Sequence, residues 1–383
     1  MNTHFYIKTL IFALIITLGG ILEGCNDAKY SVLGVHGYLK EAQGSLGHKV
    51  TVMATGTTST SLTVCISDRV QETCMFKLIP DQSALDRYNE MNGTSFIMLP
   101  EDHYTLLETI TIDKGEYEAK NVNISITPFS EEMNSSGESY AIPLRLENID
   151  GNIPTMGQTS TYVIATGSII KFSAPLLGGT NSTISVDMTP GPITMNEYTI
   201  EMRFQLSGFV NRNMAMFSAD NAFVRFEDPQ TTHDLIQIVG KNSVYLNAIT
   251  PFEANKWQHL AITYDGSKHH IYVNGKHDAE KAISTGVEEF TTISFIATSQ
   301  FSKAKCLMSE VRIWDKALSE NQLKNNMVVV SPKADGLRAY WKMNEGSGRI
   351  FEDATGNGYT ATIGKDIEWI HDILSTDVST PWE

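Results

Sequence analysis

Polar and apolar residues alternate one by one along YTIEMRFQL, residues 198–206, and this pattern constrains the fold more than any other in the chain. The apolar side carries Tyr198, Ile200, Met202, Phe204 and Leu206. Successive side chains of a β-strand point to opposite faces, so a period of two predicts a strand with one buried face and one face exposed to solvent. Similar runs recur along the chain, separated by turn signals rich in glycine and asparagine. Many short strands at this spacing predict an all-β protein made of sandwiches or jelly rolls.

The segment KWQHLAITYDGSKHHIYVNGK, residues 256–276, predicts a hairpin of the same kind. The turn DGSK reverses the chain, and Asp265 can accept hydrogen bonds from the backbone two residues on. Asn274 and Gly275 favour the positive φ angles of a second tight turn. Apolar residues fall on both faces of the first strand, which suits a strand inside a two-layer sandwich.

The histidines of this hairpin raise the alternative of a transition-metal site, which needs three or four converging ligands. His269 and His270 are adjacent, so on a strand they point to opposite faces. His259 and His277 could approach each other across the turns, but no spacing motif supports this. We therefore favour a purely structural hairpin.

The length of 383 residues fits two domains of ordinary size. One strand ends in TYVIATGS and another opens with IIKFSA, so we place the domains at residues 25–165 and 166–383, with a short linker.

Two short helices are expected. One lies in SALDRYNEMNG and stops at Gly93, and the other follows Ser319, where Gln322 completes a capping box.

Residues 1–24 are predicted to be an export signal and not part of the fold. Lys8 precedes the apolar run TLIFALIITLGG, which is too short to act as a stop-transfer helix. Leu22 and Gly24 before Cys25 resemble the lipobox of bacterial lipoproteins, which implies that Cys25 becomes the lipidated first residue. Glu23 departs from the small or apolar residue usual at that position. An ordinary secretory signal with a coincidental cysteine is the alternative.

The charge of the chain argues against nucleic acid as a partner. It has 29 basic and 44 acidic residues, a formal net charge of −15, and no basic face for a phosphate backbone. An acidic surface of this kind fits glycans or proteins better.

The cysteines show no paired Cys-x-x-Cys spacing of a structural zinc site. Cys65 and Cys74 lie in two strand-like runs joined by a polar turn. In an oxidising compartment they could form a disulfide, and two buried thiols are the alternative.

The first domain resembles a domain of unknown function found at the N-terminus of Bacteroidetes surface lipoproteins. The matching features are Tyr88 and Asn89, the turn at Leu99 and Pro100, Gly115, and the strand that contains 140–143. The resemblance covers roughly residues 30–165. It implies an immunoglobulin-like β-sandwich that spaces a sugar-binding or sugar-active domain from the membrane, and it implies no catalytic residues.

The second domain resembles the laminin-G-like branch of the concanavalin A-like lectin/glucanase fold. The matching segments occur in the order of that family: YTIEMRFQL, the hairpin at 256–276, MSEVRIWDKALSENQL and GLRAYWKMNEGSGRIFEDATGNGYTATI. They span nearly all of residues 168–370. The resemblance implies a jelly-roll sandwich, but this fold carries lectins, hydrolases and passive adhesins alike.

Members of this fold sometimes bind calcium through carboxylate, amide and backbone oxygens. The best local candidate is EDATGNG, where Asp353 and Asn357 flank a glycine turn. A plain Asx-type turn is the alternative that we favour. No other cofactor is indicated.

Glucanase relatives of the fold carry acidic residues at alternate positions of one strand, Glu-x-Asp-x-Glu, so that the carboxylates share a face. No such run occurs in this sequence, and no nucleophile elbow or phosphate loop occurs either. This favours a protein that is not an enzyme.

Sugar binding would use aromatic stacking and amide or carboxylate hydrogen bonds. Trp257, Trp314 and Trp341 lie in segments that match the family, and we expect them in the core. The candidate contacts are the loop residues Arg225, Tyr245 and Asn247.

Together these features predict a lipid-anchored outer-membrane protein, at the cell surface or facing the periplasm, that binds extracellular carbohydrate without cleaving it. The membrane is contacted through the lipid anchor only. A glycoside hydrolase with an unrecognised carboxylate pair and a protein-binding adhesin are the two rival functions.

Overall fold

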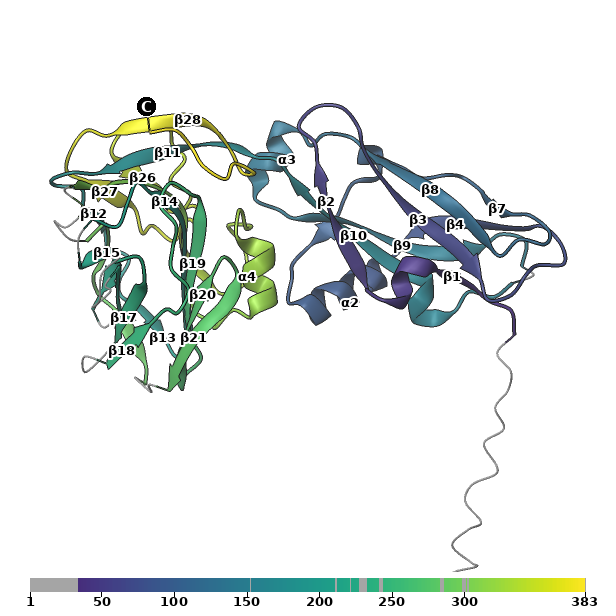
Figure 1. The fold of residues 1–383 in the computed structure, drawn as a ribbon, viewed down its shortest axis with the longest axis horizontal. Helices are drawn as coiled ribbons and strands as arrows, with labels where there is room; N and C mark the ends of the chain where they lie inside the picture. The colour runs from purple at the N-terminus through teal and green to yellow at the C-terminus, as the bar shows by residue number, and fades with distance from the viewer. Residues whose placement is uncertain are drawn as a thin grey trace, which may run out of the picture.

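The chain folds into two β-sandwiches joined end to end in the computed structural model (Figure 1). The structure describes residues 34–382 except 152, 211, 221, 227–232, 241–243, 283–285, 298–300 and 302. The predicted all-β class is confirmed. The predicted export signal, residues 1–24, and Cys25 lie outside the described residues. Over the described ranges, no helix is both long and apolar enough to cross a membrane.

The first domain packs a four-stranded sheet against a six-stranded one. The first sheet has the order β1 (Gly37–Leu39), β3 (Thr58–Ile66), β8 (Glu118–Ile126) and β6 (Tyr104–Thr105). The second has the order β2 (Gly47–Val52), β10 (Thr161–Ser168), β9 (Tyr140–Asn148), β4 (Cys74–Pro80) and β7 (Ile110–Ile112), with β5 (Ile97–Met98) beside β9. Alternate residues of both sheets, such as Val64 and Leu144, meet in one apolar core.

The sequence allowed either a disulfide between Cys65 and Cys74 or two buried thiols. In the structure both cysteines are free thiols. Val64 and Ile66 face the core from β3, so the intervening Cys65 faces outward. Cys74 faces the core from β4, in the other sheet, and its Sγ lies 3.8 Å from the carbonyl oxygen of Ile112. The alternative of two buried thiols therefore holds, and burial raises the pKa of each.

The second domain stacks two eight-stranded sheets around the largest apolar core. The proximal sheet, which faces the first domain, has the order β21 (Lys276–Ala282), β20 (Lys268–Val273), β19 (Gln258–Tyr264), β14 (Tyr198–Leu206), β24 (Lys305–Trp314), β11 (Lys171–Gly178) and β28 (Glu368–Leu374), with β25 (Leu337–Trp341) beside β24. The distal sheet has the order β18 (Val244–Asn247), β17 (Ile236–Gly240), β16 (Ala222–Phe226), β15 (Met214–Ala219), β23 (Ile293–Phe295), β12 (Ile184–Val186), β27 (Ala361–Ile363) and β26 (Ile350–Phe351). A separate pair joins β13 (Ile193–Met195) to β22 (Glu288–Phe290).

Helices are few and short, as the sequence predicts. In α2 (Gln82–Asn92) the cap is Asp81, and Gly93 ends the helix with a φ of 61°. In α4 (Glu320–Asn326) the predicted capping box forms between Ser319 and Gln322. Among the described residues, further helical segments are α3 (Glu131–Ser136) and the 3₁₀ turns at Lys40–Gln43, Glu101–His103 and Gly157–Ser160.

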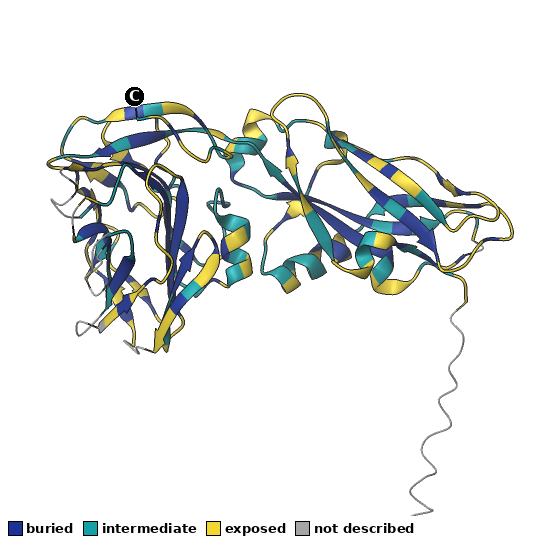
Figure 2. Cartoon of the chain, viewed as in Figure 1, coloured by how far each residue is buried: buried dark blue, intermediate teal, exposed yellow. Residues whose placement is uncertain are grey.

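The junction between the domains lies at residues 169–170, because β10 belongs to the first sandwich up to Ser168 and β11 opens the second at Lys171. The sequence placed the boundary three residues earlier, at 165/166. Within the described ranges, side-chain hydrogen bonds cross from one domain to the other at two places: Ser331 Oγ donates to Glu138 Oε1 at 2.9 Å, and Lys342 Nζ donates to the carbonyl of Ser135 at 3.4 Å. Figure 2 shows that buried residues follow the strands, whereas exposed residues gather on helices and loops.

Candidate functional site

A buried charge network lies on the outer face of the proximal sheet, where α4 covers it. Arg312 donates to Glu201 Oε1 at 3.0 Å and to the backbone carbonyl of Asn326 at 2.8 Å. Glu201 also accepts from Trp314 Nε1 at 2.8 Å and lies 3.0 Å from His259 Nε2. The side chains of Glu201 and Arg312 are both 0% exposed.

The electrostatics of this network hold Glu201 ionised. Burial alone would raise the pKa of Glu201, but the charge of Arg312 and the hydrogen bond with His259 lower it to about 2. A sealed carboxylate of this kind stabilises the sheet, and it has no access to a substrate.

A β-bulge next to the network turns two polar residues toward the first domain. Glu201 pairs with Arg312, but Arg203 pairs with Ser309, so β24 has one residue more than β14 in this stretch. Glu310 absorbs the difference with a φ of 57°, which is uncommon for a residue other than glycine. Ser309 and Glu310 consequently both line the space between the domains.

That space is a cleft of about 870 Å³. Its lining from the second domain includes Phe172, Arg203, Ser309, Glu310, Lys342 and Asn344. Its lining from the first domain includes Glu131, Glu132 and Ser135, on or beside α3. The volume falls within the range of small-molecule and oligosaccharide pockets, which often lie between domains.

Two charged side chains of the cleft wall, Glu310 and Arg203, are held in position by neighbouring residues. Glu310 accepts hydrogen bonds from Arg312 and from the hydroxyl of Tyr340. The guanidinium of Arg203 lies over the ring of Trp257, 4.8 Å from its centroid, and donates to the carbonyl of Ser375 at 3.1 Å. Burial lowers the pKa of Arg203 to about 10, so it keeps its charge at neutral pH.

Two buried polar atoms in the cleft lining, Ser309 Oγ and Asn134 Oδ1, lack a hydrogen-bond partner within the described part of the chain. Ser309 is 1% exposed, and its Oγ makes no hydrogen bond within the described part of the chain. Buried polar groups are nearly always paired, so such an atom in a cleft wall points to a ligand or solvent partner. The wall of the cleft from the second domain therefore presents a carboxylate, a hydroxyl, a lysine and an amide.

The three predicted sugar contacts come together on the distal sheet, although they lie on strands and not on loops. Arg225 on β16 donates to Gln237 Oε1 at 2.8 and 3.1 Å, and Gln237 donates to Asn247 Oδ1 at 2.8 Å. Tyr245 is 45% exposed and lies two positions before Asn247 on β18. The expectation of loops was wrong, because the register Arg225–Gln237–Asn247 aligns these side chains across three strands. Their role in binding stays a prediction.

The predicted calcium ligands Asp353 and Asn357 share one turn. Asp353 Oδ1 accepts from the backbone of Tyr340 and Thr355 and from Thr355 Oγ1, and its Oδ2 accepts from the backbone of Tyr359. Asn357 Nδ2 donates to the carbonyl of Arg338 at 2.9 Å. These are the contacts of the Asx-type turn that the sequence favours, and calcium binding here stays a prediction.

The prediction that the tryptophans are buried and the predicted strand geometry of the hairpin are both confirmed. Trp257, Trp314 and Trp341 are buried. His269 points into the core, where it lies 3.1 Å from the Tyr198 hydroxyl, whereas His270 lies on the opposite face near Asp265.

Comparisons with known proteins agree with this architecture. The model of a family described as an N-terminal domain matches residues 34–153. The Concanavalin A-like lectin/glucanases superfamily model matches residues 178–324. The resemblance of each domain is thereby confirmed, and the second domain is concanavalin A-like. No curated protein matches the sequence.

Among solved structures, a candidate carbohydrate binding protein from Bacteroides ovatus is 23% identical, with a TM-score of 0.55, and the match covers 88% of this chain and 97% of that one. This likeness shows a shared two-domain fold. A SAP-like pentraxin from Limulus polyphemus is 15% identical over 54% of this chain and 95% of its own, with a TM-score of 0.32. A two-domain protein of unknown function from Bacteroides fragilis is 11% identical over 71% and 94%, with a TM-score of 0.30. The last two scores are too low to bear on function.

Proposed function

We propose that this protein binds extracellular carbohydrate in the cleft between its two domains and does not cleave it. The observation that carries the proposal is the cleft wall, where Ser309 and Lys342 lie beside Glu310, whose carboxylate is held by Arg312 and Tyr340. Sugar hydroxyls both donate and accept hydrogen bonds, so they match a wall that combines a carboxylate with cationic and hydroxyl donors. The Bacteroides ovatus protein of the same fold, described as a candidate carbohydrate binding protein, supports this class of ligand.

Binding without hydrolysis is supported by the positions of the carboxylates. Glycosidases place two carboxyl groups on either side of the scissile bond. Glu201 is sealed beneath α4 and shares Arg312 with Glu310, so Glu201 cannot act as the second carboxyl group beside Glu310. The remaining acidic residues of the cleft belong to the first domain.

We expect the double variant Lys342→Ala with Asn344→Ala to lose sugar affinity roughly tenfold or more, since each hydrogen bond to a charged group contributes about 1.5–3 kcal/mol. A soluble form without residues 1–25 is first screened on a glycan array, and the hit is titrated by calorimetry. The matched control is Arg225→Ala with Tyr245→Ala on the distal sheet, which should leave the affinity unchanged.

Three other outcomes would overturn the proposal. Loss of binding only in the distal-sheet variant moves the site to Arg225, Tyr245 and Asn247. Turnover of an oligosaccharide that Glu310→Gln abolishes makes the protein a glycoside hydrolase. Absence of retention on every polysaccharide, together with capture of a defined protein partner, makes it an adhesin.

We propose in addition that Cys25 carries the lipid anchor and holds the protein at the outer membrane, at the cell surface or facing the periplasm. The lipobox-like residues Leu22 and Gly24 support this assignment. The full-length chain should incorporate labelled fatty acid and sediment with membranes, and Cys25→Ser should abolish both, because two acyl chains are needed for stable anchoring. Cleavage and secretion of the Cys25→Ser protein at the wild-type rate would instead indicate an ordinary secretory signal.

A further inference from the structure

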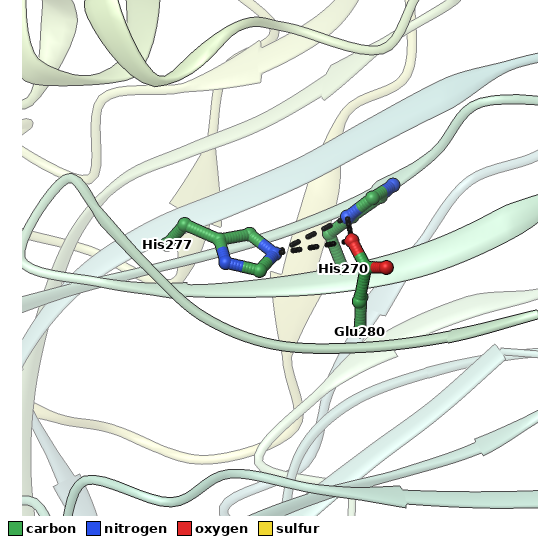
Figure 3. Close-up of side chains that lie close together, drawn as sticks. All are labelled: His270, His277 and Glu280. Atoms are coloured by element: carbon green, nitrogen blue, oxygen red, sulfur yellow. Dashed lines mark hydrogen bonds and ion pairs between the residues drawn. The ribbon is translucent and has the colours of Figure 1, made fainter.

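Three potential metal ligands converge on the outer face of the proximal sheet, at its edge (Figure 3). His270 Nδ1 lies 3.3 Å from His277 Nε2 and 3.3 Å from Glu280 Oε2. His277 Nε2 and Glu280 Oε2 are 3.7 Å apart. Two imidazole nitrogens and one carboxylate oxygen therefore form a nearly equilateral triangle.

A second β-bulge creates this triangle. In a regular strand His277 and Glu280, three positions apart, would point to opposite faces. On β21, however, Ala279 pairs with Ile271 and His277 pairs with Tyr272, so Asp278 is an extra residue. The bulge brings His277 to the face that carries Glu280 and its partner His270. Asp278 instead accepts hydrogen bonds from the backbone of Ile249 and Thr250, at 2.7 and 3.0 Å, which fixes the bulge.

Neighbouring groups orient each donor atom toward the centre. Asp265 Oδ2 lies 3.2 Å from His270 Nε2, which leaves Nδ1 of that ring to face the triangle. Lys268 holds Glu280 through Oε1 at 2.7 Å, so Oε2 is directed at the two imidazoles. The carboxylate–histidine contact is the second layer commonly found behind a metal-bound imidazole.

The dimensions match a tetrahedral ion. Bonds of about 2.0–2.2 Å from zinc to nitrogen and oxygen ligands place neighbouring ligand atoms about 3.3–3.6 Å apart at tetrahedral angles. Two edges of the triangle measure 3.3 Å and the third 3.7 Å. Two histidines and one glutamate are also a ligand set found at zinc sites that keep one position open. His277 and Glu280 are 37% and 44% exposed, so solvent or an external ligand can reach the fourth position.

Hydrogen bonds alone satisfy this cluster less well. Nδ1 of His270, Nε2 of His277 and Oε2 of Glu280 face one another, while Asp265 occupies the other nitrogen of His270. A proton on one imidazole gives the other two atoms a single N–H to share, whereas one divalent cation accepts a lone pair from all three. We propose that His270, His277 and Glu280 bind one divalent metal ion of the zinc class, with an open fourth position.

The proposal is tested on the two-domain soluble chain, titrated with Zn²⁺ by calorimetry and with Co²⁺ by visible absorption. One ion per chain and the intense d–d bands of tetrahedral Co²⁺ are expected. His270→Gln with His277→Gln should weaken Zn²⁺ binding roughly 100-fold or more, and Asp265→Asn, which removes only the orienting contact, about tenfold. The matched control is His371→Gln on β28, an exposed histidine outside the cluster, which should bind like the wild type.

Thermal unfolding with and without Zn²⁺ tests the same site independently. Zn²⁺ should also raise the thermal midpoint of the wild type and the control but not of the double variant, because a ligand that binds only the folded state stabilises it. The unfolding curves of all variants without metal show that each one is folded. Octahedral Co²⁺ spectra, or equal Zn²⁺ affinity in the double variant and the wild type, would overturn the assignment.

Discussion

Replacing Arg312 with methionine is expected to lower the free energy of unfolding of the second domain by about 3–5 kcal/mol. The substitution keeps an unbranched apolar side chain but leaves Glu201 in a fully buried position without its cationic partner. Glu310 loses a donor as well, and the carbonyl of Asn326 loses its hydrogen bond. A buried charge stripped of its partner costs more than the pair contributed, because its desolvation is no longer offset.

The distribution of tryptophan makes the measurement specific. All five tryptophans lie after residue 250, so their fluorescence reports unfolding of the second domain alone. The control is Arg338→Met, which removes an arginine from a 3.2 Å pair with Asp315 in which both side chains are at least one-third exposed. Exposed pairs contribute about 0–1 kcal/mol, so the control should shift the denaturant midpoint only slightly. Equal shifts in the two variants would mean that burial of the Arg312 network adds nothing to stability.

The alternation of polar and apolar side chains predicted the sandwich strands, because this pattern follows directly from the two-residue period of an extended chain. The run at 198–206 became β14, although its polar face is buried as well and not exposed to solvent as predicted. The hairpin at 256–276 became β19 and β20 with both of its turns as expected. Asn274 and Gly275 adopt φ angles of 52° and 73°, as the second turn requires. Capping chemistry placed α4 equally well, since its box is local in sequence.

Alternation fails where a strand carries an extra residue. The bulges at Glu310 and Asp278 each shift the strand register by one residue. Each bulge thereby brings together polar side chains that strict alternation would place on opposite faces. The hairpin histidines looked inert for this reason: His269 and His270 do face apart, but His277 and Glu280 join His270 only through the bulge. No residue type in the sequence marks either bulge. The cleft was equally hidden, because its walls come from segments far apart in the chain, such as α3 and β24.

Acid is expected to destabilise the second domain through Glu201. Its pKa is held at about 2 in the folded state against an ordinary value of 4.5, since Arg312 and His259 outweigh the effect of burial. A carboxyl group with a lowered folded pKa stabilises the fold fully above its unfolded pKa, and this contribution disappears as the pH falls toward the folded value. The contribution of Glu201 is therefore complete above about pH 5 and lost between about pH 4.5 and 2, with a total on the order of 3 kcal/mol.

The test compares the free energy of unfolding at pH 5.5 and pH 3, again by tryptophan fluorescence in denaturant, for the wild type and Glu201→Gln. Glutamine keeps the shape of the side chain but does not titrate, so the variant should be less stable at pH 5.5 and lose less on acidification. Other carboxyl groups with lowered pKa values, such as Asp265 and Asp220, titrate in both proteins and cancel in the comparison. Parallel pH profiles would contradict the assignment, because they would mean that Glu201 takes up its proton at the same pH whether the chain is folded or unfolded.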